Sequence, residues 1–200
     1  MRTASPSRRR AAPRRRRLLW LTAALVPTAL DGALSGCTGA TATATVPIPG
    51  GVGRGVPVVV THVVDGDTVE VRLPDGSTDR VRLLGIDTPE TVKPNTPVQC
   101  YGPEASARTK ALVPDGTDVL LQRDVEARDR YGRLLAYVWR RRDGLFVNRS
   151  LVADGHARTL SIDPNTAHRV DLSQAQNLAR QGGLGLWGAC PVTGSDRSGG

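Results

Sequence analysis

Val64-Asp65-Gly66-Asp67-Thr68-Val69 and Arg82-Leu83-Leu84-Gly85-Ile86-Asp87-Thr88-Pro89-Glu90-Thr91 are the two stretches that decide the fold of this chain. In each of them, apolar residues typical of a buried strand adjoin carboxylates and small turn residues. Strand ends of this kind place charged groups at one edge of a rigid sheet. We therefore expect the fold to bring Asp67, Asp87 and Glu90 together.

Outward from these stretches, the sequence predicts a folded domain over residues 56–192. Five segments have the β-branched or alternating pattern of strands, and these cover residues 56–64, 68–73, 79–86, 118–123 and 134–139. Three helices are predicted: one from Pro103 to the stop at Pro114, and two more over residues 145–154 and about 165–181. Five strands with a helix after the third fit a β-barrel plus α fold, a small closed barrel of the OB-fold type.

The first 36 residues have the layout of a secretory signal. A basic region is followed by an apolar run from Leu18 to about Leu30 and by Leu34-Ser35-Gly36-Cys37. The apolar run is short for a membrane-spanning helix. The end of the segment resembles a bacterial lipobox, in which case Cys37 is lipidated and becomes the mature N-terminus. The alternative is ordinary cleavage nearby, so we expect export, either as a cell-envelope lipoprotein or as a secreted protein.

Composition limits what the remaining residues can be. With 200 residues, of which 39% are hydrophobic, the chain allows one compact domain with tails. Residues 37–55 contain one charged residue and predict a flexible tether, and residues 193–200 predict a disordered tail. The net charge of +8 mostly belongs to the leader, because 19 basic and 18 acidic side chains remain from Cys37 onward. Net charge therefore does not indicate a nucleic-acid footprint on the domain.

The charged residues of the two stretches suit metal-assisted hydrolysis of a phosphodiester. Carboxylates bind hard cations such as Ca²⁺, and an acid that is left over can serve as a base. Arg82 and Arg133 can each offer forked donors to a phosphate. Each feature also has an ordinary explanation, since Asp-Gly-Asp is often a turn, a buried Arg82 is often a structural ion-pair partner and Arg133 can pair with Asp129 on the surface.

Taken together, four motifs resemble the staphylococcal nuclease (thermonuclease) family over residues 57–188. They are the two stretches above, Tyr101-Gly102-Pro103-Glu104-Ala105-Ser106-Ala107, and Asp129-Arg130-Tyr131-Gly132-Arg133. The resemblance implies a five-stranded barrel with three helices. It also implies a calcium-dependent nuclease that acts on single-stranded or locally opened DNA and RNA and leaves 3′-phosphate ends.

The resemblance assigns a role to each matching residue. It implies calcium binding by Asp67, Asp87 and the carbonyl of Thr88, a general base in Glu90, and phosphate contacts from Arg82 and Arg133. One departure concerns residues 159–163, which lack two tyrosines that lie near the nucleotide base in the best-studied member of the family. Tyr131, with Arg130 beside it, is the remaining candidate for substrate contact.

The three cysteines of the chain leave one without a partner. Lipidation of Cys37 would leave Cys100 and Cys190 to form a disulfide, which an exported protein can keep. The alternative is two unlinked thiols.

Two other function classes compete with the nuclease. One is a non-catalytic nucleic-acid-binding module of the same fold on the cell envelope, and the other is a structural envelope lipoprotein. A pure binding module gains nothing from acids that repel one another, so the retained acids and arginines favour an enzyme, which we expect to be monomeric.

Overall fold

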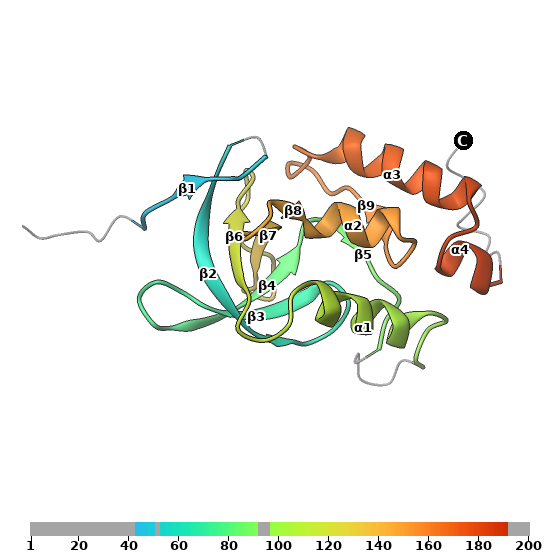
Figure 1. Cartoon of the computed structure of the whole chain (residues 1–200), viewed down its shortest axis with the longest axis horizontal. Helices are drawn as coiled ribbons and strands as arrows, with labels where there is room; N and C mark the ends of the chain where they lie inside the picture. Colours follow the sequence, from blue (N-terminus) through green and yellow to red (C-terminus); the bar gives the residue numbers. More distant parts are fainter. Residues whose placement is uncertain (1–42, 51–52, 92–96, 192–200) are drawn as a thin grey trace, which may run out of the picture. The chain divides into compact units, whose positions relative to one another are not determined.

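A ring of five paired strands is the central feature of the fold (Figure 1). The computed structural model describes residues 43–50, 53–91 and 97–191, all within the unit Thr41–Gly200. In order around the ring, the strands are β2 (Arg54–Val63), β3 (Thr68–Arg72), β4 (Thr78–Leu83), β7 (Leu134–Arg140) and β6 (Asp118–Gln122), and β6 pairs back onto β2. The pairs are antiparallel except for β4 with β7.

Alternating apolar residues fill the inside of the ring. Val69 and Val71 on β3 and Val81 and Leu83 on β4 are all at most 1% exposed, while their polar neighbours in sequence lie outward. β-Branched side chains pack well on such a half-buried pleated surface. The sequence pattern therefore specifies which face of each strand is buried.

The prediction of one continuous strand over residues 79–86 is wrong. β4 ends at Leu83, and β5 (Gly85–Asp87) pairs with β9 (Arg158–Leu160) in a separate two-stranded sheet. Gly85 has a φ of 76°, and a Cβ there would lie 2.5 Å from Leu172 Cδ1, so the break depends on glycine. Buried Asn148 stabilises it by donating to Leu84 O at 2.8 Å and accepting from the Val138 N–H at 2.9 Å.

The described part of the chain contains four helices, one more than the sequence predicts. They are α1 (Gly102–Leu112), α2 (Val147–Ala153), α3 (Arg169–Gln181) and the single turn α4 (Leu186–Ala189). The helices lie together on one side of the ring, and α2 packs against α1, α3 and β7 (Figure 1). Within the described ranges, every helix lacks the length and apolar character needed to cross a membrane.

Short strands at two places were not predicted. β8 (Leu145–Phe146) pairs with β7 and delays the start of α2 to Val147. β1 (Val46–Pro47) pairs with the start of β2, and Ile48 joins the core at 4% exposure. The described part of the predicted tether is therefore folded, and β2 begins within it at Arg54. The leader, Cys37 and the predicted tail (193–200) lie outside the described residues.

Candidate active site

The turn between β2 and β3 orients Asp67. Asp65 Oδ1 accepts a hydrogen bond from the Asp67 N–H at 3.0 Å, and the Thr109 hydroxyl on α1 donates to Gly66 O at 2.6 Å. A Cβ on Gly66 would lie 2.6 Å from the Thr88 hydroxyl oxygen, so only glycine allows this approach. Asp67 Oδ2 then accepts from the Thr88 N–H at 2.9 Å and from its hydroxyl at 3.1 Å. These hydrogen bonds connect the stretch 64–69 directly to the stretch 82–91.

Arg82 lies between two of the predicted acids. Its Nη1 is 3.1 Å from Asp67 Oδ2, and its Nη2 donates to Asp87 Oδ1 at 3.0 Å. Nη1 also donates to the carbonyls of Leu83 at 3.0 Å and Ile86 at 2.9 Å. The Arg82 side chain is only 14% exposed. The guanidinium is therefore held rigidly beside both carboxylates, and its structural role as an ion-pair partner is present in addition to any catalytic one.

Burial and neighbouring charges raise the pKa of two acids at the site. Burial and the charge of Asp67 raise the pKa of Asp87, while Arg82 opposes the shift. Burial, followed by the charge of Asp67, raises the pKa of Asp65 to about 6. A bound cation would relieve the repulsion that contributes to both shifts.

Glu90, in the loop after β5, lines the same cavity as Asp67 and Asp87. Its carboxylate Oε1 accepts from the Thr91 N–H at 3.0 Å, and its own N–H donates to Gln99 Oε1 at 3.0 Å. A cavity of about 540 Å³ brings the predicted catalytic and metal-binding residues together; it is lined by Asp65, Asp67, Arg80, Arg82, Asp87, Thr88, Pro89, Glu90, Tyr131 and Arg133.

The turn 129–133 supplies Arg133 and Tyr131. Asp129 Oδ2 accepts from Arg133 Nε at 2.8 Å, and Asp129 Oδ1 accepts from the N–H groups of Tyr131 and Arg133. Tyr131 is 68% exposed, and the Arg130 and Arg133 guanidiniums lie 4.8 and 5.5 Å from its ring centre. Arg130 lines an adjoining cavity of about 790 Å³ rather than the one that contains the acids.

Three charged residues at the site were not predicted from the sequence, and one of them, Arg80 on β4, lines the cavity. Asp65 lines the cavity, and its one signal was its position two residues before Asp67. Arg158 on β9 pairs in register with Asp87, whose pKa its charge lowers, and its guanidinium lies 5.2 Å from the ring centre of Trp187. Arg158 lies in no recognisable motif, so the β5–β9 pairing was needed to find it.

The donor set fits a hard cation. Asp67, Asp87 and the backbone at Thr88 offer oxygen atoms, which suit Ca²⁺ or Mg²⁺ better than soft transition metals. Across the described ranges, no group of three or more histidine, cysteine, aspartate or glutamate side chains is arranged to hold a metal. The protein would therefore fill only part of a coordination shell and leave the rest to water and substrate.

Replacing Arg82 tests whether it holds this cluster together. Arg82→Ala leaves buried Asp67 without its ion-pair partner, so we expect the free energy of unfolding to fall by about 3 kcal/mol. The matched control is Arg80→Ala on the same strand, because Arg80 is 63% exposed and pairs with Glu70; its cost should be below about 1 kcal/mol. Urea unfolding followed by circular dichroism gives both values, and equal costs would contradict the structural role of Arg82.

Comparison with known proteins identifies the family of this chain. A family model described as "Staphylococcal nuclease homologue" matches residues 80–189, more than half of the chain. The chain is 47% identical to a thermonuclease of Staphylococcus intermedius over 134 residues, which are 67% of this chain and 77% of that protein. It is 44% identical to a thermonuclease of Staphylococcus hyicus over 128 residues (64% and 73% of the two chains), and 41% identical to endonuclease YncB of Bacillus subtilis (strain 168) over 133 residues (66% and 62%). The chain therefore belongs to the staphylococcal nuclease family.

Proposed function

We propose that this chain is a calcium-dependent endonuclease that hydrolyses phosphodiester bonds of DNA and RNA. Its family and its nuclease relatives make it a hydrolase of the nuclease class. The observation that carries the finer proposal is that one cavity is lined by two candidate metal-binding acids, a third acid and two arginines. In this proposal the closed ring of strands is the OB-type barrel, and the site lies at one of its rims.

Asp67, Asp87 and the carbonyl of Thr88 would hold the cation. When bound, Ca²⁺ neutralises the charge that develops on the phosphate oxygens. Two carboxylates give few charged ligands, so we expect a dissociation constant of roughly 10⁻⁴ to 10⁻³ M, as in extracellular calcium modules.

Glu90 is proposed as the general base. It takes a proton from the attacking water, whose oxygen forms a bond to phosphorus while the bond to the 5′ oxygen breaks; the 5′ oxygen takes up a proton from water, and the products are a 3′-phosphate and a 5′-hydroxyl. Arg82 and Arg133 offer donors to the phosphate oxygens, where the negative charge grows. Because Arg82 is already fixed by three hydrogen-bond acceptors and by its ion pair with Asp67, its charge needs no reorganisation during the reaction.

The substrate contacts favour single-stranded or locally opened nucleic acid. Exposed Tyr131, with Arg130 beside it, can stack on an unpaired base. Leu160 and Ile162 line the adjoining cavity at 40% and 64% exposure, so aliphatic rather than aromatic contacts would meet a base there. All proposed contacts come from one chain, so the enzyme would act as a monomer.

A non-catalytic nucleic-acid-binding module on the cell envelope is the alternative. It would need the arginines but not three acids so close together, where burial and then the charge of Asp67 raise the pKa values of Asp65 and Asp87. The structure of the acid cluster therefore favours catalysis over simple binding.

A calcium titration tests the proposed function. Cleavage of single-stranded DNA by the purified protein should appear with calcium, vanish with a chelator and leave 3′-phosphate ends. Asp87→Asn removes one charged ligand, so half-maximal activity should need at least about tenfold more calcium. An unchanged titration would remove Asp87 from the metal site, and binding of DNA without cleavage under any divalent ion would favour the binding module.

Replacing the proposed base gives a second test. Glu90→Gln keeps the shape of the side chain but cannot take up a proton, so we expect kcat to fall by about 10² to 10⁴ with the fold unchanged. Glu104→Gln, at an exposed position in the first turn of α1, is the matched control and should cleave at the wild-type rate. Wild-type turnover by Glu90→Gln would rule out the assignment.

We also propose export and lipid attachment at Cys37, on the basis of the signal-like first 36 residues and the disulfide in the folded domain. Wild-type protein expressed in a bacterial host with lipoprotein processing should enter the detergent phase of a membrane fraction. Cys37→Ala should move it to the aqueous phase. Equal partitioning of the two proteins would contradict lipidation and favour ordinary secretion.

A further inference from the structure

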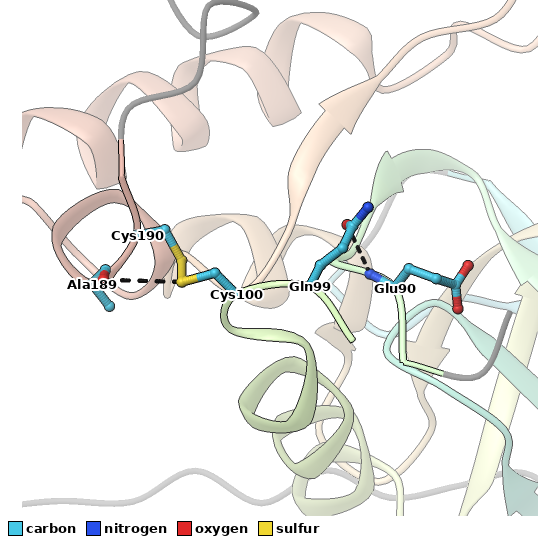
Figure 2. Close-up of a disulfide and its surroundings, with 5 residues drawn as sticks. All are labelled: Glu90, Gln99, Cys100, Ala189 and Cys190. Carbon is cyan, nitrogen blue, oxygen red and sulfur yellow. Dashed lines mark hydrogen bonds between the residues drawn. A yellow bond between two sulfur atoms is a disulfide. The ribbon is translucent and has the colours of Figure 1, made fainter. Parts of the chain in front are cut away.

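Glu90 and Gln99 are hydrogen-bonded to each other in both directions. The Glu90 N–H donates to Gln99 Oε1 at 3.0 Å, and the Gln99 N–H donates to Glu90 O at 2.9 Å. Figure 2 shows the Gln99 side chain directed at the Glu90 nitrogen, with the Glu90 carboxylate pointing away from it. The backbone of Glu90 is therefore fixed on both its N–H and its C=O side by one residue.

The turn that contains Gln99 also packs closely against Glu90. Gly102 donates its N–H to Gln99 O at 3.0 Å, and a Cβ on Gly102 would lie 3.0 Å from Glu90 O and 3.2 Å from Pro89 O. Tyr101 has a φ of 69°, which is uncommon for a non-glycine residue. Residues 99–102 thus form a tight turn that packs against the backbone of Glu90.

A covalent bond holds this turn in place. Cys100 forms a disulfide with Cys190, directly after α4, with 5.9 Å between their Cα atoms (Figure 2). α4 is itself anchored, because Leu186 is 2% exposed and its N–H donates to Gly155 O at 2.8 Å. The disulfide therefore connects the turn 99–102, which contacts Glu90, to the anchored helix α4.

We propose that Gln99 is a positioning residue for Glu90 and that the Cys100–Cys190 disulfide keeps Gln99 in place. The inference rests on the proposed function, in which Glu90 is the general base. The disulfide acts through Gln99, since the Glu90 carboxylate points away from it. Displacing a catalytic group by about 1 Å can cost as much as 10²-fold in rate, so loosening the turn should lower kcat more than it changes KM.

The disulfide also makes the activity sensitive to reductants. Cys100 is exposed and Cys190 is partly buried, so a dithiol reagent can reach the bond. The reagent supplies two electrons and two protons, the disulfide becomes two thiols, and the reagent becomes a cyclic disulfide. The turn is then held only by its hydrogen bonds and packing.

Gln99→Ala is the first arm of the test, with Gln174→Ala at an exposed position of α3 as the matched control. We expect kcat to fall by about 10- to 100-fold in Gln99→Ala, with KM within about twofold of wild type. Gln99→Glu keeps a carbonyl-type acceptor and should recover part of the loss. Equal kcat in Gln99→Ala, Gln174→Ala and wild type would overturn the positioning role.

The second arm removes the disulfide by Cys100→Ser with Cys190→Ser. Rates are expressed per folded molecule, measured by near-ultraviolet circular dichroism, because losing the bond also lowers stability. Val119→Ala, a buried change on β6, controls for destabilisation alone and should keep wild-type kcat per folded molecule. The serine variant should lose kcat, and adding Gln99→Ala to it should cost little more, because both changes act through one contact.

The outcomes separate this inference from the proposed function. If wild-type protein fails to cleave DNA with any divalent ion, the proposed function fails and the inference fails with it. If wild type cleaves but the serine variant has wild-type kcat per folded molecule, only the role of the disulfide is overturned. Full additivity of the two changes would show that the disulfide does not act through Gln99.

Discussion

The placement of one guanidinium between two carboxylates is the interaction on which the site depends. Arg82 is 14% exposed, and the side chain of Asp67 is 9% exposed, so neither charge is fully solvated. A buried charge that loses its partner is strongly destabilising, so Arg82 and Asp67 each depend on the other. In the same cluster, burial and then the charge of Asp67 raise the pKa values of Asp65 and Asp87. The cavity is lined by four acids and three arginines, so a bound cation would add to an incomplete balance of charge.

The break in the third predicted strand is part of this arrangement. If β4 continued without interruption to Asp87, its backbone carbonyl groups would form hydrogen bonds with the neighbouring strands of the ring. Because Gly85 turns the chain, Leu83 O and Ile86 O both face Arg82 Nη1, and Asp87 moves to the β5–β9 pair. The ring supplies Asp67, Arg82 and Arg133, whereas Asp87 and Glu90 come from the side of the helices. The site thus spans a junction between two parts of the fold, and its geometry depends on how firmly that junction is held.

Particular residues show what the sequence could predict and what it could not. Alternating valines at 69, 71 and 81 mark the buried face of the ring, since burial on one face has a strict period of two. The break at Gly85 could not be predicted from the sequence, because the run Leu83-Leu84-Gly85-Ile86 is apolar throughout. The turn of the chain away from β4 depends on contacts with Leu172 and Asn148, which are distant in the sequence. β1 was missed because Val46 and Ile48 are flanked by prolines. Motifs identified the candidate site residues, but Arg158 follows only from strand pairing, and the roles of all of them stay predictions.

The candidate site is supported by two kinds of interaction that respond differently to conditions. The polar cluster around Arg82 is electrostatic, so it depends on pH, on salt and on any bound cation. The Cys100–Cys190 disulfide joins residues 90 positions apart and acts largely on the unfolded chain, where closing a loop of that length is worth about 4 to 5 kcal/mol in the chain-entropy model. That contribution is insensitive to salt and to metal. In the folded state the same bond fixes the turn that contains Gln99, so a contact that does not vary with salt or metal lies beside a charge cluster whose interactions vary with both.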